Sequence, residues 1–333
     1  MLSSNTFESA PHREIAFLLI ERFSMMAFFS AVEPLRIANR IAERTLYSWL
    51  TLSLDGHPVS ASNDMRLMVD GCPDDAGSPF ALAICSGFTP LPSPGRTLRK
   101  WLQRLDQAGC RLGGIDTGAF ILAEASLISP TDRVSLHWES LPAFQERWPH
   151  LKTSETLFEL GHRRFFCAGG AAAMDMSLAV IARHHGDALA HAVAEQLIHD
   201  RLRGREDQQR LSIARRLDLH QRPLIEAIAL MEQHIEDPLS IQALADKASV
   251  SRRQLQRLFV EQLESSPGAW YLKLRLTRAR TLLEEGEMSI TAVAQACGFT
   301  SSSGLAHAFR RHYGCPPGRF RAQGEMADNH PKA

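Results

Sequence analysis

The stretch SITAVAQACGFTSSSGLAHAF, residues 289–309, repeats the pattern of an earlier stretch, SIQALADKASVSRRQLQRLF, residues 240–259. Serine, small and apolar positions recur at an offset of 49 residues up to the pair Val250 and Phe299, and at an offset of 50 residues beyond it. One residue is therefore added in the second copy, at or after the turn. Two copies are too few for a solenoid, so the pattern predicts a duplicated module.

Each copy predicts a short helix, a tight turn and a longer helix. Ser240 and Ser289 stand where an N-cap hydroxyl satisfies free backbone N–H groups, and apolar residues follow at helical spacing. In the first copy Ser251 and Gln254 form a capping-box pattern, and in the second copy Gly298 supplies a permissive turn residue. This is the pattern of a helix-turn-helix, whose second helix lies in the DNA major groove.

The second helix of each copy presents polar and basic side chains on its outward side. Arginine can bind guanine through two hydrogen bonds and glutamine can bind adenine, while hydroxyl and basic groups also suit phosphates. Residues 267–285 read as one helix of about 28 Å, which could hold two reading helices about one DNA turn apart. An all-α bundle with coincidental repetition is the alternative. The candidate DNA-binding residues are Arg252, Arg253, Gln256, Arg257, Ser301, Ser302, Ser303, His307, Arg310 and Arg311.

The charge distribution singles out the same end of the chain. The whole chain of 333 residues has 37 basic and 37 acidic side chains, which excludes a uniformly basic nucleic-acid coat and an acidic tail. Residues 267–322, however, carry eight Lys and Arg against three Glu. This surplus predicts contact with a polyanion, and a solvated basic helix face is the alternative.

Residues 223–322 resemble the two-helix-turn-helix DNA-binding domain of the AraC/XylS family of transcriptional regulators. The resemblance rests on residues 290–321, which include the Gly298 turn, Phe309, the break at Gly314 with two prolines, and Phe320. It implies sequence-specific binding to promoter DNA, usually with activation of the promoter by recruitment of RNA polymerase.

Residues 13–200 have the alternation of an α/β sheet with parallel pairing. Short apolar runs suited to buried strands are followed by stretches of helical spacing. The charge-dense segment 201–222 is interpreted as a linker, partly helical, to the all-α region 223–322. The predicted strands cover residues 15–20, 49–54, 81–85 and 112–115, and the predicted helices cover residues 25–40 and 96–108.

A sharp strand-to-helix turn is predicted within GGIDTGAFILAEASL, residues 113–127. The apolar strand runs into Asp116, and a helix opens directly with Thr117 and Gly118. Small ligands bind at the carboxyl edge of parallel sheets, where the first amides of a helix also favour anions. The alternative role for Asp116 is that of a simple N-cap.

This segment is similar to the nucleophile elbow of the class I glutamine amidotransferase-like, PfpI-type fold, which is flavodoxin-like. His137 in LHWE matches the family's downstream histidine, and Glu33 in AVEPLRIAN matches its N-terminal acidic residue. The family's enzymes carry cysteine at the elbow, where this chain has Asp116. A carboxylate lacks the nucleophilicity of a thiolate, so we expect no amidotransferase or protease activity. Fused to an AraC/XylS-type domain, the fold matches a known group of regulators.

The elbow is predicted to form a ligand pocket with two carboxylates, Asp116 and Glu33, near His137 and Trp138. Such a set suits a cationic head, and helix amides suit a carboxylate, so a zwitterion is expected. Residues 23–40 also resemble the branch of these regulators that governs carnitine, glycine betaine and related methylated amines. Core packing of Trp138 and an interior role for His137 are the alternatives. The candidate ligand-binding residues are Glu33, Ser86, Gly87, Asp116, Thr117, Gly118, His137 and Trp138.

The remaining features indicate a soluble, cytoplasmic protein without cofactor or metal. The six cysteines contain no CxxC pair, and no apolar run reaches the roughly 20 residues that a bilayer requires. The leading hypothesis is a ligand-responsive regulator, an activator of catabolic genes that acts as a homodimer. Its alternatives are an amidase- or hydrolase-like enzyme tethered to a DNA-binding domain, and a constitutive DNA-bending or scaffold protein.

Overall fold

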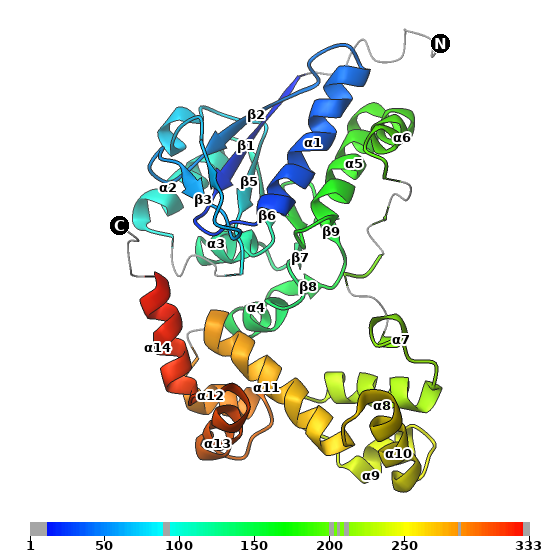
Figure 1. The fold of residues 1–333 in the computed structure, drawn as a ribbon. Helices are drawn as coiled ribbons and strands as arrows, with labels where there is room; N and C mark the ends of the chain where they lie inside the picture. The colour runs from blue at the N-terminus through cyan, green and yellow to red at the C-terminus, as the bar shows by residue number, and fades with distance from the viewer. Residues whose placement is uncertain are drawn as a thin grey trace. The chain divides into compact units, whose positions relative to one another are not determined.

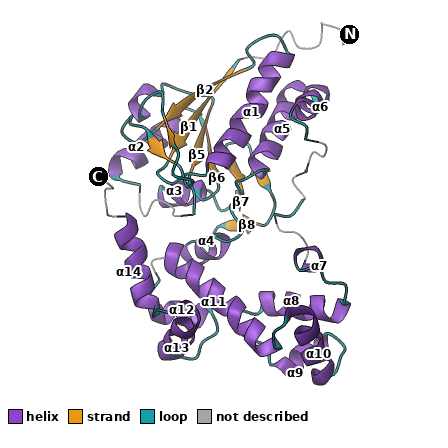
Figure 2. Ribbon diagram, in the orientation of Figure 1, coloured by secondary structure: helices purple, strands orange, loops and turns teal. Residues whose placement is uncertain are grey.

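The computed structural model of the chain describes residues 12–88, 94–199, 203–204, 207–209, 213–285 and 288–328, with the backbone alone described at residues 215, 285 and 323–328. The chain divides into two compact units, Met1–Gln209 and Arg210–Ala333. Figure 1 traces the chain through both units, and Figure 2 shows strands in the first unit and, among the described residues of the second unit, helices without strands. Residues 201–202, 205–206 and 210–212 of the predicted linker lie outside the described residues.

The first unit is built on a six-stranded sheet, as the alternating sequence predicts. In spatial order its strands are β2 (Tyr47–Leu52), β1 (Arg13–Leu19), β5 (Ala81–Cys85), β6 (Arg111–Ile115), β10 (Arg164–Cys167) and β9 (Phe158–Leu160). All neighbours pair in parallel except β10 and β9, which are antiparallel. Ile115 pairs with both Cys85 and Cys167, so three strands end level with one another. Asp116 follows directly on this common edge.

The four predicted strands are confirmed: β5 has the predicted ends, and the other three are shifted by one or two residues. β2 lies two residues before the predicted run 49–54, because Tyr47 is buried and Leu54 is 45% exposed. Asp55 accepts hydrogen bonds from the Ser53 hydroxyl and the His57 N–H, which turns the chain away after β2.

Helices cover both faces of this sheet (Figure 1). α1 (Met25–Ile41), α5 (Ala172–His185) and α6 (Asp187–Gln196) contribute to one apolar core together with side chains of β1 and β5. α2 (Arg96–Gln107) and α3 (Gly118–Glu124) lie against the other face. The helices predicted at 25–40 and 96–108 are confirmed. The short elements are β3 (Val59–Ser60), β4 (Arg66–Leu67), the 3-10 turn η1 (Pro73–Asp75), β7 (Arg133–Ser135), α4 (Leu141–Arg147) and β8 (Lys152–Ser154).

The second unit is helical and contains the two predicted helix-turn-helix motifs. They are formed by α9 with α10 and by α12 with α13, and the helix predicted at 267–285 joins them. The helices are α7 (Ile213–Arg216), α8 (Arg222–Gln233), α9 (Ile241–Lys247), α10 (Arg252–Leu263), α11 (Pro267–Glu285), α12 (Ile290–Ala296), α13 (Ser302–Tyr313) and α14 (Pro317–Asp328).

The two motifs share their local geometry as closely as the repeat predicts. The predicted capping box is present, because the Ser251 hydroxyl accepts from the Gln254 N–H and the Gln254 side chain accepts from the Ser251 N–H. The turn residue has left-handed backbone in both copies, with φ 58° at Ser249 and 70° at Gly298. Since these residues are 49 apart and the helices after them are 50 apart, the added residue follows the turn. A Cβ on Gly298 would lie 2.5 Å from the Ile235 carbonyl oxygen, so this copy requires glycine.

Helix α11 is fastened to both motifs. The Tyr271 hydroxyl donates to the His234 carbonyl at 2.5 Å and accepts from the Leu239 N–H at 3.3 Å, just before α9. One turn further on, the Arg275 guanidinium donates to the carbonyls of Cys297 and Gly298 at 2.8 and 2.7 Å, in the turn of the second motif. The spacing of the two reading helices is therefore fixed by side chains of a single helix.

Candidate DNA interface and candidate ligand site

Helix α10, the second helix of the first motif, has one buried stripe and one exposed face. Leu255 and Phe259 are fully buried against α8 and α9, and this orients the helix. All four predicted DNA-binding side chains of this helix are exposed. The exposed residues are Arg252, Arg253, Gln256 and Arg257.

Helix α13 repeats this arrangement in the second motif. Leu305 and Phe309 are buried, while Ser303, His307, Arg310 and Arg311 are exposed and Ser302 is half-buried. The Ser301 hydroxyl accepts a hydrogen bond from the Gly304 N–H at 3.1 Å, so this residue caps the helix. A hydroxyl that caps a helix N-terminus can still approach a phosphate, which is the kind of contact that positions a protein on DNA.

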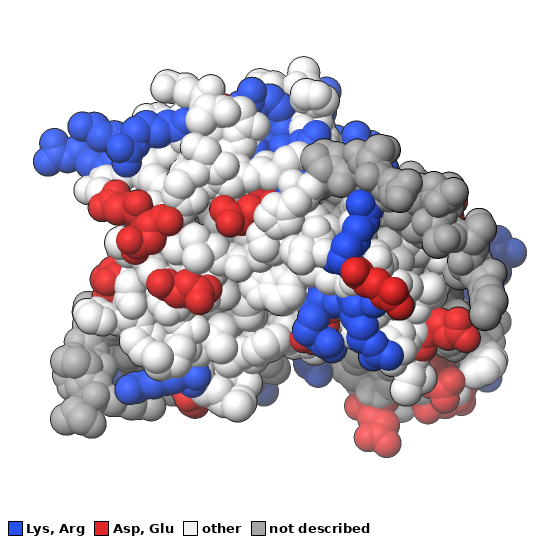
Figure 3. All heavy atoms as spheres, turned by 90° about the horizontal axis from the view of Figure 1, so that it is seen from above, with Lys and Arg blue, Asp and Glu red and all other residues white. Residues whose placement is uncertain are grey.

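Some of the basic surplus of residues 267–322 serves the fold. Arg275 binds the turn of the second motif and stacks on Phe299 with 4.2 Å from guanidinium to ring centre. Arg280 pairs with Glu284 at 2.8 Å. Of the three acidic residues, Glu287 lies outside the described residues. The face drawn in Figure 3 displays basic and acidic side chains together, as expected for a chain with no net charge.

Asp116 occupies a strained turn at the carboxyl edge of the sheet of the first unit. Its backbone is left-handed, with φ 61°, a conformation that Asp and Asn tolerate better than most residues. Its N–H donates to the Cys167 carbonyl at 2.9 Å. The N-cap residue of α3 is Thr117, and Asp116 Oδ1 is buried without a hydrogen bond to any described residue. The alternative of a capping role for Asp116 therefore has no hydrogen bond to support it.

Backbone glycines crowd closely around this turn. A Cβ on Gly169, after β10, would lie 2.8 Å from Asp116 Oδ2. A Cβ on Gly87 would collide with the Arg22 carbonyl, and one on Gly118 would collide with the Ile84 carbonyl. Gly169 thus leaves room for the Asp116 carboxylate, and the other two glycines let the backbone segments around the turn pack closely.

Burial shifts both titratable groups of the site, Asp116 and His137, toward their neutral forms. Burial, and to a lesser extent the charge of Glu139, raises the pKa of Asp116 to about 7. Burial lowers the pKa of His137, whose Nδ1 lies 3.9 Å from a Glu139 oxygen and has no hydrogen-bond partner among the described residues. A cation bound beside Asp116 would lower the pKa of this carboxyl group, so the group would lose its proton near neutral pH.

A cavity of about 270 Å³ opens beside Asp116. Three aromatic rings lie at its wall: the Phe88 and His137 ring centres are 5.3 Å apart, and those of His137 and Trp138 are 5.6 Å apart. Four of the predicted ligand-binding residues line this cavity. They are Gly87, Asp116, His137 and Trp138.

The other four predicted residues lie elsewhere. Ser86 and Thr117 are buried and do not line the cavity; the Thr117 hydroxyl donates a hydrogen bond to the Gly87 carbonyl. Gly118 packs against the backbone of β5. Glu33 does not line the cavity, and its carboxylate accepts hydrogen bonds of 2.7 and 2.9 Å from Arg36, one turn along α1. The structure therefore does not bring Glu33 and Asp116 together at the cavity as a pair of carboxylates.

Two cavity residues from the charge-dense segment were missed from the sequence. Arg203 lines the cavity and donates to Asp175 at 3.0 and 2.6 Å. Gln209 also lines it, and its side-chain amide donates to the carbonyls of Leu136 and Thr156 at 2.9 and 3.0 Å. The one available signal was Asp175, a lone carboxylate in an alanine-rich helix that has to be paired when buried.

Comparison with known proteins identifies the family. A helix-turn-helix domain model matches residues 244–323. The HTH-type transcriptional regulator CdhR of Pseudomonas aeruginosa is 44% identical over 306 residues, which cover 92% of this chain and 90% of that protein. A crystal structure of an AraC family transcriptional regulator from Pseudomonas putida matches with a TM-score of 0.51 and 29% identity, over 56% of this chain and all of the other. This chain belongs to the AraC family of HTH-type transcriptional regulators.

A second relative supports this assignment over nearly the whole chain. The HTH-type transcriptional regulator GbdR of Pseudomonas aeruginosa is 42% identical over 313 residues, which cover 94% of this chain and 85% of that protein. The predicted DNA-binding regulator is thereby confirmed, and the tethered-enzyme alternative finds no support among these relatives. Within the described part of the chain, no helix is both long and apolar enough to cross a membrane.

Proposed function

We propose that the first unit of this regulator senses a small zwitterion with an ammonium group and a carboxylate, such as glycine betaine, carnitine or an amino acid. The main support is the buried Asp116 carboxylate, which faces the cavity and leaves Oδ1 without a hydrogen bond to any described residue. A buried polar group left in this state costs about 1–3 kcal/mol. A ligand cation would remove that cost.

The cavity wall suits a quaternary ammonium group. Such a group has no N–H to donate, so a carboxylate and aromatic faces are the partners that stabilise it. A ring face contributes about 0.5–2 kcal/mol to binding of a cation. Asp116, Trp138 and Phe88 all line the cavity and provide both kinds of partner.

The ligand carboxylate has a cationic partner in Arg203, which borders the same cavity. The Asp175 carboxylate is bound by Nε and Nη2 of this guanidinium. The planar fork of an arginine suits carboxylates. A zwitterion held between Asp116 and Arg203 would compete with Asp175 for the same guanidinium.

This competition gives a route from the ligand to the helical unit. Arg203 and Gln209 belong to the segment that leads from the sheet toward α7. A ligand shifts a conformational equilibrium only as far as its affinities for the two states differ. Because the ligand would contact Arg203, its binding favours one arrangement of this segment over another. The DNA-binding unit responds to that arrangement by activating catabolic promoters through RNA polymerase.

The first unit is proposed to bind its ligand without catalysis. The thiols next to the elbow are Cys85 and Cys167, and both are buried. Burial raises the pKa of Cys167 to about 12 and that of Cys85 further still, so both stay protonated at neutral pH. A protonated, buried thiol is inert as a nucleophile. We further propose that the regulator acts in the cytoplasm as a homodimer that pairs through this unit.

Titration calorimetry tests the sensing function. Glycine betaine, carnitine, sarcosine and arginine are titrated into the full chain, and at least one is expected to bind to wild type and fail to bind to Asp116→Asn. The matched control is Asp74→Asn, which changes an exposed carboxylate in η1 and should leave binding unchanged. Absence of binding by all four compounds would remove the proposal.

A further inference from the structure

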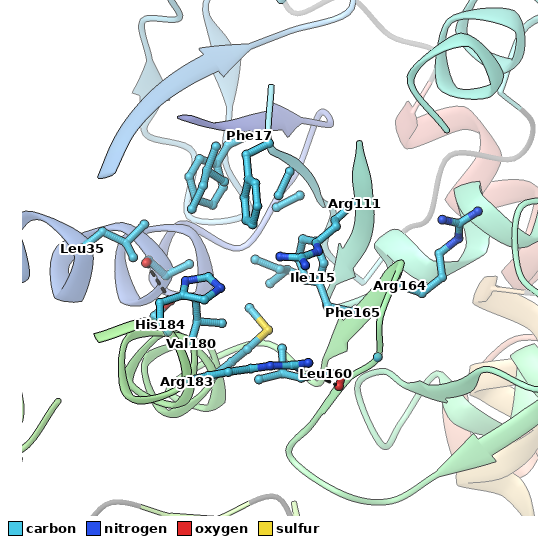
Figure 4. A pocket seen from close by; sticks show the side chains of 18 residues that line it. Phe17, Leu35, Arg111, Ile115, Leu160, Arg164, Phe165, Val180, Arg183 and His184 are labelled. Atoms are coloured by element: carbon cyan, nitrogen blue, oxygen red, sulfur yellow. Dashed lines mark hydrogen bonds between the residues drawn. The ribbon is translucent and has the colours of Figure 1, made fainter. Parts of the chain in front are cut away.

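A second cavity lies in the first unit between one face of the sheet and the helices α1 and α5 (Figure 4). It is bounded by Ala81, Arg111 and Arg164, the first residues of β5, β6 and β10, and by helices α1 and α5. Its volume is about 90 Å³. It extends from the amino ends of these strands as far as Ile115, the last residue of β6, and it shares no lining residue with the cavity beside Asp116.

The interior of this cavity is apolar. Side chains of the sheet face those of the two helices across it, as Figure 4 shows for Phe17, Leu35 and Val180. An apolar cavity in a protein does not hold water well, since water there lacks the two to four polar partners that it needs. The cavity therefore suits a hydrocarbon group.

Two arginines border the cavity without a carboxylate partner among the residues that the structure describes. Arg111 donates to the His162 carbonyl at 3.2 Å and stacks 4.5 Å from the Phe80 ring centre. Arg183 donates to the Leu160 carbonyl at 3.5 Å. Within the described residues, neither guanidinium forms an ion pair with an acid. Arg164, in contrast, pairs with Asp106 at 2.8 Å, a carboxylate that it shares with Arg163.

The arginines around the cavity repel one another, and no protonated histidine of the described residues adds to their charge. Burial lowers the pKa of Arg111, and the charges of Arg183 and Arg13 lower it further. Burial also lowers the pKa of His184 to about 4, with Arg13 and Arg111 contributing, so this imidazole is neutral at physiological pH. Like charges placed together in a partly desolvated position repel each other until an anion arrives.

We propose that this cavity is a second ligand site, which binds a small carboxylate with a short aliphatic tail. The tail fills the apolar interior, and the carboxylate binds Arg111 and Arg183 at the mouth. The cavity is smaller than an engineered one of roughly 150 Å³ that admits the six carbons of benzene, which limits the buried part of the tail to about four carbons. The site does not depend on the zwitterion pocket, and failure of one proposal leaves the other standing.

The test measures binding of hexanoate to the full chain by ligand-observed NMR, and the melting temperature of the protein by thermal shift. Hexanoate is expected to bind and raise the melting temperature, while hexanol and hexylammonium bind at least about tenfold more weakly. Arg183→Glu should weaken hexanoate binding at least about tenfold. Because Arg183 is exposed, this variant should fold, whereas the half-buried Arg111→Gln serves as a second probe. The matched control Lys100→Glu, on the exposed side of α2, should bind hexanoate as wild type does.

Four outcomes would overturn the proposal. They are no binding of hexanoate up to about 10 mM, equal binding of hexanol, unchanged binding by Arg183→Glu, and closure of the cavity by a second copy of the chain in solution. Binding of glycine betaine is measured in the same samples. It should survive in Arg183→Glu and be lost in Asp116→Asn, which distinguishes the two sites.

Discussion

The guanidinium of Arg203 binds the carboxylate of Asp175 through two hydrogen bonds, and the Asp175 side chain is fully buried in α5. The backbone N–H of Arg203 adds a third hydrogen bond, to Asp175 Oδ1 at 3.1 Å, and His199 Nε2 lies 3.1 Å from the same oxygen. The segment that follows the sheet is thus attached to the helix that lies beside the Asp116 cavity. Removing one partner of such a pair leaves a buried charge without compensation.

Arg203→Gln should destabilise the first unit by about 2–3 kcal/mol. This is less than the cost of breaking a fully buried ion pair, because a third of the Arg203 side chain is exposed to solvent. The double variant Arg203→Gln with Asp175→Asn should recover part of this loss, since it removes the buried charge as well. Urea unfolding of wild type, both single variants and the double variant forms a double-mutant cycle. Additive effects would show that the two side chains are not coupled.

Asp116→Asn should stabilise the protein in the absence of ligand at alkaline pH. The pKa of Asp116 rises from its usual 3.8 to about 7 on folding, so the folded state holds the proton more tightly and loses stability as the pH rises from about 4 to 7. Above pH 7 the full cost is present, up to about 4 kcal/mol, and below pH 4 it vanishes. Asparagine keeps the left-handed backbone and has no charge. Unfolding at pH 4.5 and pH 8 tests this, and a constant difference between variant and wild type would contradict it.

Binding of a quaternary ammonium zwitterion should strengthen with pH. The cation requires the ionised Asp116, so affinity should rise almost tenfold per pH unit below about 7 and level off above it. Calorimetry of glycine betaine between pH 5.5 and pH 8.5 measures the profile. A flat profile in wild type would exclude Asp116 as the partner of the cation.

The exposed arginines of the two reading helices should differ in effect. Arg253→Ala should weaken binding to the cognate site by about 1–3 kcal/mol and relax specificity, if the side chain reads a base. Arg311→Ala should weaken binding to all sequences and reduce the salt slope by about one, if it binds phosphate. Fluorescence anisotropy on cognate and random duplexes over a range of salt separates these roles. Equal losses on both duplexes for both variants would refute the assignment.

The sequence predicted the second unit almost completely. Its helices form through local signals, such as the capping box at Ser251 and the left-handed turn at Gly298, and these depend only on neighbouring residues. Because the motif is duplicated, each helix was predicted independently from two stretches of sequence. The role of Arg275 was hidden, since a bond from α11 to the Gly298 carbonyl joins residues 23 positions apart.

The ligand site was predicted only in part. Asp116 and Gly87 follow adjacent strands, so parallel pairing brings them to one edge, and His137 was placed by its resemblance. Glu33 was expected there because of the same resemblance. Instead, its carboxylate forms an ion pair with Arg36, one turn further along α1. Arg203 could not be found, because a linker side chain reaches the cavity through a tertiary contact with Asp175 and no local pattern encodes that contact.

The most direct test is run-off transcription from a promoter fragment enriched by the purified regulator from genomic DNA, with RNA polymerase present. The zwitterion that binds in calorimetry should increase the transcript with wild type. With Asp116→Asn the fragment should still be bound, but the transcript should not respond. An equal response of the variant, or failure of the wild type to bind any fragment at low salt, would contradict control of a DNA-binding unit through the Asp116 cavity.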